Sequence, residues 1–314
     1  MHHPLTPPLT ASFVVIDNFL PTELAEGMRA DLERHFSNPY SHQAHTHEIW
    51  NYWFVPGMYT YLRTHPEKII QNERIEGFVA SLRTWSAEVL GFGKVSWPFL
   101  SLYINGCQQG LHNDSKNGRF AFVYSLSKNQ RRTSGGQTLI FKEGDLFRRH
   151  LRTASAGTGF FEAIEPTFNR LVVFDDRLIH GVERVGGSLD PVEARCVLHG
   201  HIEESGPIIV GHLTIDSLRE GILAVMSGFV AECSAAMTLY HGPLVLRFRV
   251  APSGKVAEVE ILVDRVVSER EGDIDWNSLR ANLIAALGTA AFPAASGETR
   301  VTLPVTFGGR VSLT

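Results

Sequence analysis

The chain has 314 residues, a hydrophobic content of 44% and a formal net charge of −4. A chain of this length can form one large domain or two modest ones, and it can bury a sizeable core. The slight negative charge argues against a general nucleic-acid-binding protein, which needs a basic face. No apolar run is long enough to span a membrane, and the opening residues MHHPLTPPLT lack the charged and apolar regions of a secretory signal. The three cysteines, Cys107, Cys196 and Cys233, match no zinc or disulfide spacing, so we expect a reducing, cytoplasmic location. Since no apolar run is long enough to span a bilayer, we expect no membrane association.

The N-terminal part of the chain predicts one strand and two helices. The β-branched run in Ser12–Asp17 predicts a strand, and apolar residues recur at helical spacing in Pro21–Phe36 and again in Arg74–Leu90. Pro21 suits the start of a helix, where a backbone N–H would have no intrahelical partner. Between the two predicted helices lies an aromatic-rich stretch, Trp50–Leu62. Such a stretch is typical of core packing, and the wall of a substrate pocket is the alternative.

From about Pro98 to Glu203 the chain consists of short β-type runs separated by turn residues. The runs read FLSLYI, FAFVYSL, QTLIF, FFEAI, RLVVF and CVLHGHI. Many short strands at this spacing are typical of a β-sandwich or barrel. We therefore expect a mainly β domain, with the two preceding helices on one outer face of its sheet.

A different pattern follows Glu203 and predicts a small α+β domain. We expect a helix, two strands joined by a turn, a second helix and a last strand, at Ser217–Leu239, Val245–Val250, Val256–Val263, Trp276–Leu287 and Thr299–Phe307. The boundary is predicted near residue 213, which gives domains of residues 1–212 and 213–314.

Two metal-ligating side chains stand two residues apart in the sequence Leu-His-Asn-Asp. On a strand, residues with this spacing point the same way, so His112 and Asp114 can converge on one point. His180 is the best candidate for a third ligand, because it follows the apolar run Leu171–Phe174, where a strand would emerge into a site. Two imidazoles and one carboxylate on one face leave open positions on a metal, as Fe(II) oxygenases need for a bidentate co-substrate and O₂.

Two other interpretations of these histidines remain open on the sequence alone. A His-x-Asp sequence also occurs in ordinary surface turns, and the chain has 14 histidines. A second pair, His199 and His201, has the same spacing and could form a rival ligand set with Glu203. A packing or supporting role suits His199 better.

An iron site of this kind would bind 2-oxoglutarate, whose far carboxylate needs a cation inside an apolar pocket. Arginine suits this role because its planar guanidinium binds a carboxylate through two hydrogen bonds and stays charged. Arg195 is the predicted anchor since it interrupts an apolar strand, with Arg184 as the alternative. Tyr103 and Tyr124, on the strands flanking the His-x-Asp segment, carry hydroxyl groups that could also reach this carboxylate.

These segments together resemble the prolyl-4-hydroxylase-like branch of the 2-oxoglutarate/Fe(II)-dependent dioxygenases. The matching pieces are VVIDNFLPTEL, SLYINGCQQGLHND, GRFAFVYSLSK, SGGQTLIFKEG, IEPTFNRLVVFDDRLIHGVERV and EARCVLHGHI. They are especially similar to the oxygen-sensing prolyl hydroxylase subgroup. The resemblance implies a distorted double-stranded β-helix, or jelly-roll, as the core of the fold.

Carried over by position, the resemblance implies a role for each candidate residue. His112, Asp114 and His180 match the iron ligands of the family, and Arg195 matches the arginine that anchors 2-oxoglutarate. Tyr103 matches the family tyrosine on the strand before His-x-Asp.

The chain also departs from the family pattern. The tyrosine that often binds the co-substrate on the next strand falls at Ser125, with Tyr124 beside it, which puts the role of Tyr124 in doubt. Val197 stands where many relatives carry serine or another small residue. Halogenating relatives lack the metal-binding carboxylate, so the presence of Asp114 predicts hydroxylation.

The C-terminal segment Gly242–Phe307 resembles a TonB C-terminal or AgmX/PglI-type domain. The matching pieces are VLRFRVAPSGKVAEVEIL and FPAASGETRVTLPVTF. The resemblance implies a module for protein interaction or dimerisation, and the combination of the two domains suggests a bacterial protein.

We therefore predict a dioxygenase that uses Fe(II), 2-oxoglutarate and O₂, with ascorbate as an optional reductant, to hydroxylate a C–H bond. The expected substrate is a prolyl or other amino-acid residue in a peptide or protein. The alternatives are a hydroxylase of a free amino acid or small metabolite, and a non-catalytic protein-binding scaffold, because a fold does not decide the substrate. Trp50–Trp53 and the insert between Gly144 and Thr158 are expected to form walls or lids of the pocket.

Overall fold

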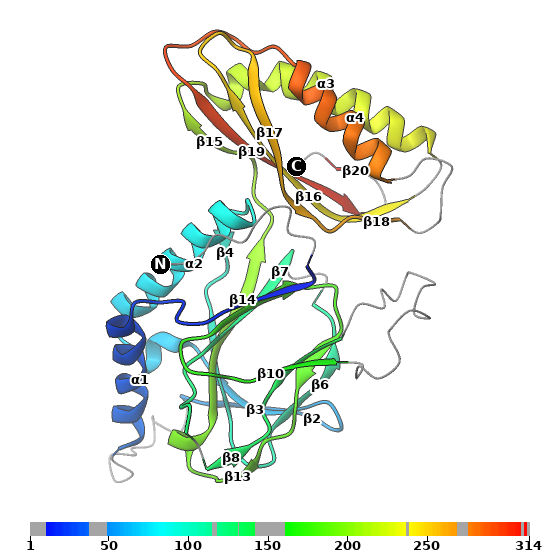
Figure 1. Ribbon diagram of the computed structural model, residues 1–314. Helices are drawn as coiled ribbons and strands as arrows, with labels where there is room; N and C mark the ends of the chain where they lie inside the picture. The colour runs from blue at the N-terminus through cyan, green and yellow to red at the C-terminus, as the bar shows by residue number, and fades with distance from the viewer. Residues whose placement is uncertain are drawn as a thin grey trace. The chain divides into compact units, whose positions relative to one another are not determined.

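The computed structural model of the protein describes residues 11–37, 49–114, 118–130, 132–141, 161–236, 239–268, 276–308 and 311–312. The described residues form two compact units (Figure 1). Residues 12–84 and 95–203 belong to the first unit, and residues 85–94 and 204–314 belong to the second. None of the described helices is both long and apolar enough to cross a bilayer.

The first unit is built on a curled, antiparallel sheet of 12 strands (Figure 1). Its neighbouring strands are, in order, β1 (Phe13–Ile16), β11 (Leu171–Asp175), β7 (Phe120–Ser125), β14 (Arg195–Glu203), β5 (Phe99–Tyr103), β3 (Tyr59–Thr64), β6 (Gln108–His112), β12 (His180–Val182), β9 (Thr138–Phe141) and β10 (Phe161–Ile164), with β2 (Asn51–Val55) paired to β3 and β4 (Lys94–Val95) paired to β14. A separate ribbon pairs β8 (Thr133–Ser134) with β13 (Gly186–Gly187). The predicted fold class, a mainly β protein with a jelly-roll core, is confirmed.

Two helices lie along one side of this curled sheet, namely α1 (Thr22–Phe36) and α2 (Asn72–Val89) (Figure 1). Pro21 precedes the first turn of α1, as predicted. Met28 of α1 and Phe78 of α2 are fully buried. The ring of Phe78 packs against Phe122 of β7, with 5.9 Å between ring centroids. The apolar stripes that predicted the helices are therefore the surfaces that pack on the sheet. Short 3₁₀ helices occupy Pro66–Lys68 and Pro191–Glu193.

The second unit has a six-stranded sheet and two helices. The strands are β15 (Ile208–Gly211), β19 (Thr299–Gly308), β16 (Tyr240–Val250) and β17 (Val256–Asp264) in spatial order, with β18 (Val267–Ser268) on β16 and β20 (Val311–Ser312) on β19. The helices are α3 (Ile215–Ala235), which begins with a capping box between Thr214 and Ser217, and α4 (Trp276–Thr289). This is the small C-terminal α+β unit that the sequence predicts.

The core of the second unit lies between its helices and one face of its sheet. Phe248 of β16, Met226 of α3 and Leu283 of α4 are all buried in the same cluster. Arg247 is next to Phe248 in sequence, so its side chain points to the opposite face of the sheet. There it donates from Nε to Thr302 Oγ1 at 3.1 Å and from Nη1 to Glu88 Oε1 at 3.1 Å. These bonds explain how an arginine is accommodated in an apolar strand.

Candidate metal centre

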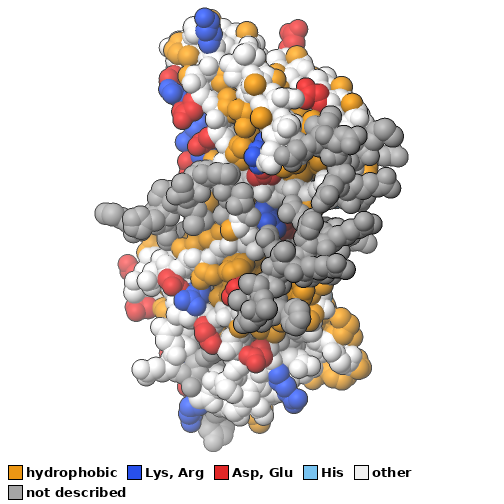
Figure 2. All heavy atoms as spheres, turned by 45° about the vertical axis from the view of Figure 1, so that its right-hand side comes forward, with side chains coloured by type: hydrophobic (Ala, Val, Ile, Leu, Met, Phe, Trp, Pro, Cys, Tyr) orange, Lys and Arg blue, Asp and Glu red, His pale blue; other side chains and the backbone are white. Residues whose placement is uncertain are grey.

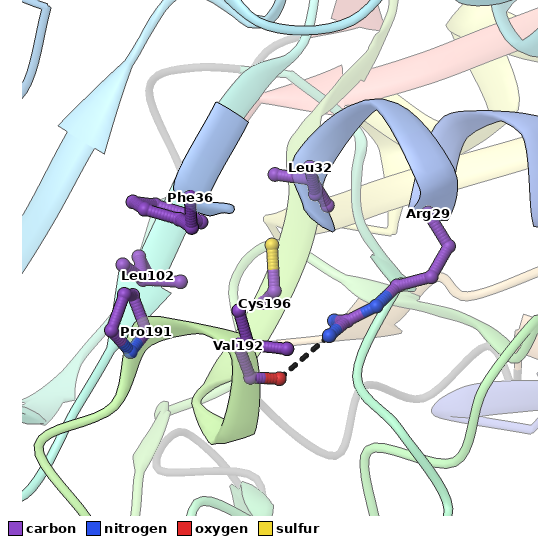
Figure 3. A pocket seen from close by; sticks show the side chains of 7 residues that line it. All are labelled: Arg29, Leu32, Phe36, Leu102, Pro191, Val192 and Cys196. Atoms are coloured by element: carbon purple, nitrogen blue, oxygen red, sulfur yellow. Dashed lines mark hydrogen bonds between the residues drawn. The ribbon is translucent and has the colours of Figure 1, made fainter. Parts of the chain in front are cut away.

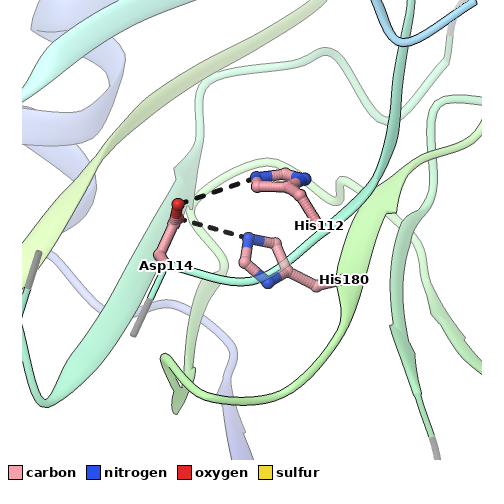
Figure 4. Close-up of side chains that lie close together, drawn as sticks. All are labelled: His112, Asp114 and His180. Carbon is pink, nitrogen blue, oxygen red and sulfur yellow. Dashed lines mark ion pairs between the residues drawn. The ribbon is translucent and has the colours of Figure 1, made fainter. Parts of the chain in front are cut away.

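The side chains of His112, Asp114 and His180 meet at one point (Figure 4). His112 ends β6, Asp114 follows that strand, and His180 begins β12, which pairs with β6 so that His180 lies opposite His112. One ligand atom from each side chain lies within 4.8 Å of the others. His112 Nε2 is 3.8 Å from Asp114 Oδ1, and His180 Nε2 is 3.4 Å from Asp114 Oδ2.

Both imidazole rings are oriented by a hydrogen bond on the nitrogen that faces away from Asp114. His112 Nδ1 lies 2.8 Å from the carbonyl oxygen of Gly110, and His180 Nδ1 lies 3.0 Å from that of Leu178. A carbonyl oxygen only accepts hydrogen bonds, so Nδ1 of each ring carries a hydrogen, and Nε2 is the nitrogen that faces Asp114. Two imidazole nitrogens and one carboxylate that face a common point are the donors that Fe(II) centres use. The donor set therefore fits a divalent metal ion.

The charges in the site also suit a metal. Burial by itself raises the pKa of Asp114, but His180 and His112 outweigh it and lower that pKa to about 2. Burial lowers the pKa of His112. At neutral pH the site thus holds an ionised carboxylate and a neutral His112 imidazole, which are the forms that bind metal. Metal–ligand bonds of about 2.1 Å place neighbouring donors about 3 Å apart, so small side-chain movements would complete the coordination.

A cavity that opens to solvent lies beside the three side chains, and Asp114 and His180 form part of its wall. Alternate residues of β14 line another part of the wall, because residues two apart on a strand face the same side. These residues are Arg195, Val197, His199 and His201. The cavity therefore connects the candidate metal ligands to the predicted co-substrate anchor.

Arg195 is buried in the wall of this cavity, with only 1% of its surface exposed. Its Nη2 donates to Thr138 Oγ1 at 3.1 Å, and its Cζ lies 4.7 Å from the ring centroid of Tyr103. Arg184, the alternative anchor, is exposed to solvent and is not among the residues that line the cavity. Of the two candidate anchors, Arg195 therefore faces the cavity and Arg184 does not.

The two predicted tyrosines lie in different places. Tyr103 lines the cavity, its hydroxyl donates to Gln109 Oε1 at 3.1 Å, and burial raises its pKa. Tyr124 does not line the cavity. Its hydroxyl donates to Asn169 Oδ1 at 2.8 Å, and its ring lies 5.0 Å from that of Phe78 on α2. Tyr124 faces the helix side of β7, so its position gives no support to the predicted co-substrate contact.

His199 and His201 line the cavity but do not belong to the cluster of ligand atoms. His199 Nε2 lies 2.7 Å from Ser101 Oγ, and burial lowers the pKa of His199 to about 3. Burial also lowers the pKa of His201. Among the described residues, the group of converging donors contains neither of these histidines nor Glu203, so the rival ligand set is not assembled.

Gln109 is a site residue that the sequence pattern does not reveal. Its amide nitrogen lies 3.3 Å from His112 Nε2. Between His180 and Val182 the register of β12 against β6 shifts, so that His112 pairs with His180 while Gln109 pairs with Val182. Gln109 and His112 are three residues apart, so a regular strand would point their side chains to opposite faces of the sheet. The bulge brings both side chains to the same face. Nothing in the local sequence marks the bulge.

The aromatic-rich stretch of the sequence forms the β2–β3 hairpin. Tyr59 meets the ring of His112 edge-on at 5.6 Å, and Tyr61 stacks on Tyr103 at 5.1 Å. The hairpin therefore borders the candidate metal centre, and it also contributes to packing. The predicted insert between residues 144 and 158 lies outside the described residues.

A second, shallow hollow lies beside α1 (Figure 3). Arg29 Nη2 donates to the carbonyl oxygen of Val192 at 2.6 Å there, and the remaining lining is apolar apart from the Cys196 thiol. Burial raises the pKa of Cys196 to about 12. An un-ionised thiol and a satisfied arginine supply no reactive group, so we assign no chemistry to this hollow.

Residues 99–203 match the family model of the 2OG-Fe(II) oxygenase superfamily. The chain carries a 2OG-Fe(II) oxygenase domain. It is accordingly a dioxygenase that uses Fe(II), 2-oxoglutarate and O₂, as predicted. The range matched to the oxygenase family contains the three converging side chains and Arg195, and it ends before the second unit. The resemblance of that unit to a TonB C-terminal or AgmX/PglI-type domain stays a prediction, as does the use of ascorbate.

Solved structures with a weaker likeness to the chain include two prolyl hydroxylases and an epimerase. A Pseudomonas putida prolyl-4-hydroxylase is 19% identical, with a TM-score of 0.43 over 61% of this chain and 91% of that chain. A Trichoplax adhaerens prolyl hydroxylase, in complex with a peptide of hypoxia inducible factor, is 15% identical, with a TM-score of 0.43 over 60% of this chain and 81% of that chain. The α-ketoglutarate-dependent epimerase SnoN from nogalamycin biosynthesis is 11% identical, with a TM-score of 0.43 over 60% and 75%. No curated protein matches the chain. The assignment of the oxygenase domain rests on the family model.

Proposed function

We propose that the protein hydroxylates a C–H bond of a prolyl or other amino-acid residue in a peptide or protein, with His112, Asp114 and His180 as the Fe(II) ligands and Arg195 as the 2-oxoglutarate anchor. The observation that carries the proposal is the convergence of two imidazole nitrogens and one ionised carboxylate beside a buried guanidinium. Three protein ligands would leave a bound Fe(II) with open positions for a bidentate co-substrate and O₂.

When bound, iron and 2-oxoglutarate supply the oxidising chemistry, in which O₂ is consumed and 2-oxoglutarate becomes succinate and CO₂. The protein orients the reactants and excludes water. The carbonyl groups of Gly110 and Leu178 hold both imidazoles in the tautomer that binds a metal through Nε2. Arg195 offers its charge in a site where water does not screen it.

Two observations support the proposed type of reaction and substrate. Asp114 supplies a carboxylate where a halogenating centre needs an open position, which favours hydroxylation. Hydrophobic side chains are exposed in patches on the face that Figure 2 displays. In the hairpin that borders the site, Trp53 is 39% exposed and stacks on Tyr61, which in turn stacks on the cavity-lining Tyr103. An exposed aromatic side chain on the cavity side of the sheet suits a substrate that extends beyond the cavity, as a peptide does.

We further propose that residues 1–212 act as the dioxygenase domain and that residues 213–314 act as a protein-interaction or dimerisation module. The separate hydrophobic core of the second unit supports this division. Light scattering of the full chain at several concentrations tests for a dimer.

The function is tested by succinate formation from 2-oxoglutarate, which should require Fe(II) and O₂. His112→Ala and Asp114→Ala should each abolish it without unfolding the protein, as checked by circular dichroism. A His112→Ala variant with the parental rate would refute the ligand assignment. Mass spectrometry of a protein digest after the reaction should find residues heavier by one oxygen atom. If only free amino acids or metabolites gain oxygen, the proposed substrate class is wrong.

A further inference from the structure

Arg63 of β3 is held between two aromatic rings. Its Cζ lies 3.6 Å from the ring centroid of Trp53 and 4.2 Å from that of Phe99. Rings on both faces restrain the plane of a guanidinium and leave its N–H groups directed outward from its edges. Arg63 is itself only partly buried, and Trp53 is 39% exposed, so this site meets the solvent. The sandwich therefore presents an oriented hydrogen-bond donor with a positive charge.

Strand register places Arg63 on the cavity side of the sheet. Arg63 lies opposite Ser101 of β5, and Ser101 Oγ is 2.7 Å from Nε2 of His199, which lines the cavity. The ring of Phe99 also lies 6.0 Å from that of His199. Arg63 is thus next to side chains that form or contact the cavity wall.

The charge of Arg63 is not neutralised within the described part of the chain, where no carboxylate lies within ion-pair distance of it. Other partly buried arginines do have such partners. Arg29 pairs with Glu33 at 3.1 Å, and Arg247 pairs with Glu88 at 3.1 Å. A half-buried cation next to a cavity, with no carboxylate partner among the described residues, favours binding of an external anion.

The distance from Arg63 to the metal ligands selects the kind of anion. Tyr59, earlier on the same strand, contacts the ring of His112. A strand rises about 3.3 Å per residue, so the backbone of Arg63 lies roughly 13 Å beyond that of Tyr59. A carboxylate further along the substrate fits this distance better than that of the oxidised residue itself. An acidic side chain about three or four residues away along an extended peptide can span it.

We propose that Arg63 binds the carboxylate of an aspartate or glutamate in the peptide substrate, with Trp53 and Phe99 holding the guanidinium in place. This inference rests on the proposed peptide hydroxylase function. It narrows the substrate class to peptides that carry an acidic residue a few positions from the residue that is hydroxylated.

The test measures binding of the carboxylate directly and does not need turnover. Full-length protein containing 5-fluorotryptophan is loaded with Zn(II) and 2-oxoglutarate, and Trp53→Phe assigns the ¹⁹F resonance of Trp53. The probes are the peptide acetyl-Ala-Ala-Glu-Ala-Ala-amide and its glutamine counterpart. The glutamate peptide should shift the Trp53 resonance and bind about tenfold more tightly than the glutamine peptide, since a charge-assisted hydrogen bond distinguishes them.

Variants identify Arg63 as the source of this preference. Arg63→Gln should abolish it, and Arg63→Lys should weaken it, because an ammonium group keeps the charge but not the planar pair of donors. Arg83→Gln, which alters an exposed arginine of α2, is the matched control and should keep it. Proton NMR spectra check that each variant is folded, and Arg63→Lys decides the matter if Arg63→Gln does not fold.

Three results would overturn the inference. One is equal binding of the two peptides to the parent protein, and another is an undiminished preference in both Arg63 variants. The third is a Trp53 resonance that shifts with free alanine and does not shift with alaninamide or with the glutamate peptide. That result would mean that Arg63 binds the carboxylate of a free amino acid. If the protein forms no succinate but still binds the glutamate peptide more tightly than the glutamine peptide, the proposed function is refuted. Carboxylate binding at Arg63 would then still stand.

Discussion

Replacement of Arg195 by methionine removes the cation from the cavity and keeps much of the side-chain volume. Arg195 is 1% exposed, so water cannot take its place beside the far carboxylate of 2-oxoglutarate. Removing one partner of a buried, hydrogen-bonded charge pair costs about 2–5 kcal/mol. The KM for 2-oxoglutarate should therefore rise by about 30-fold to several thousand-fold in Arg195→Met.

The assay is the rate of succinate formation as a function of 2-oxoglutarate concentration at saturating Fe(II). Arg184→Gln is the matched control, since Arg184 is exposed and does not line the cavity. It should keep the parental KM. Binding of Mn(II), followed by its electron paramagnetic resonance signal, should be nearly unchanged in both variants because Arg195 is not a proposed ligand. A parental KM in Arg195→Met, or a raised KM in Arg184→Gln, would show that the anchor has been assigned to the wrong residue.

Two further predictions concern Tyr124, which lies outside the cavity, and His199, which lines it. Tyr124→Phe removes the hydrogen bond to Asn169 and should lower the free energy of unfolding in urea by about 1 kcal/mol, with an unchanged KM for 2-oxoglutarate. A large rise in that KM would contradict the position of Tyr124 outside the cavity. Burial lowers the pKa of His199 from 6.5 to about 3, so between these values the unfolded chain binds a proton that the folded protein does not bind. Stability should be full above about pH 6.5 and fall as the pH drops towards 3, and His199→Gln should flatten this decline in urea unfolding experiments. An unchanged pH profile in that variant would refute the reasoning.

Features with a local cause could be predicted from the sequence alone. The helices α1 and α2 follow from apolar residues at helical spacing, and Met28 and Phe78 on those stripes are buried. The short β-type runs predicted a mainly β fold, although β16 begins earlier than expected, at Tyr240. Tyr240 pairs with Ser268 of β18, a contact that no local pattern indicates. The shared direction of His112 and Asp114 was likewise predictable, because it needs only a spacing of two residues around the end of a strand.

Features that depend on contacts between distant segments were decided only by the tertiary structure. Arg195 and Arg184 are similar candidates in the sequence, and burial in the fold separates them. The proximity of Gln109 to His112 comes from a bulge against β12, and the ring sandwich of Arg63 needs Trp53 and Phe99 from two other strands. Burial and strand register are set by which segments pair across the sheet. A residue's own neighbours in the chain therefore predict its type of structure, but not which distant side chains it meets.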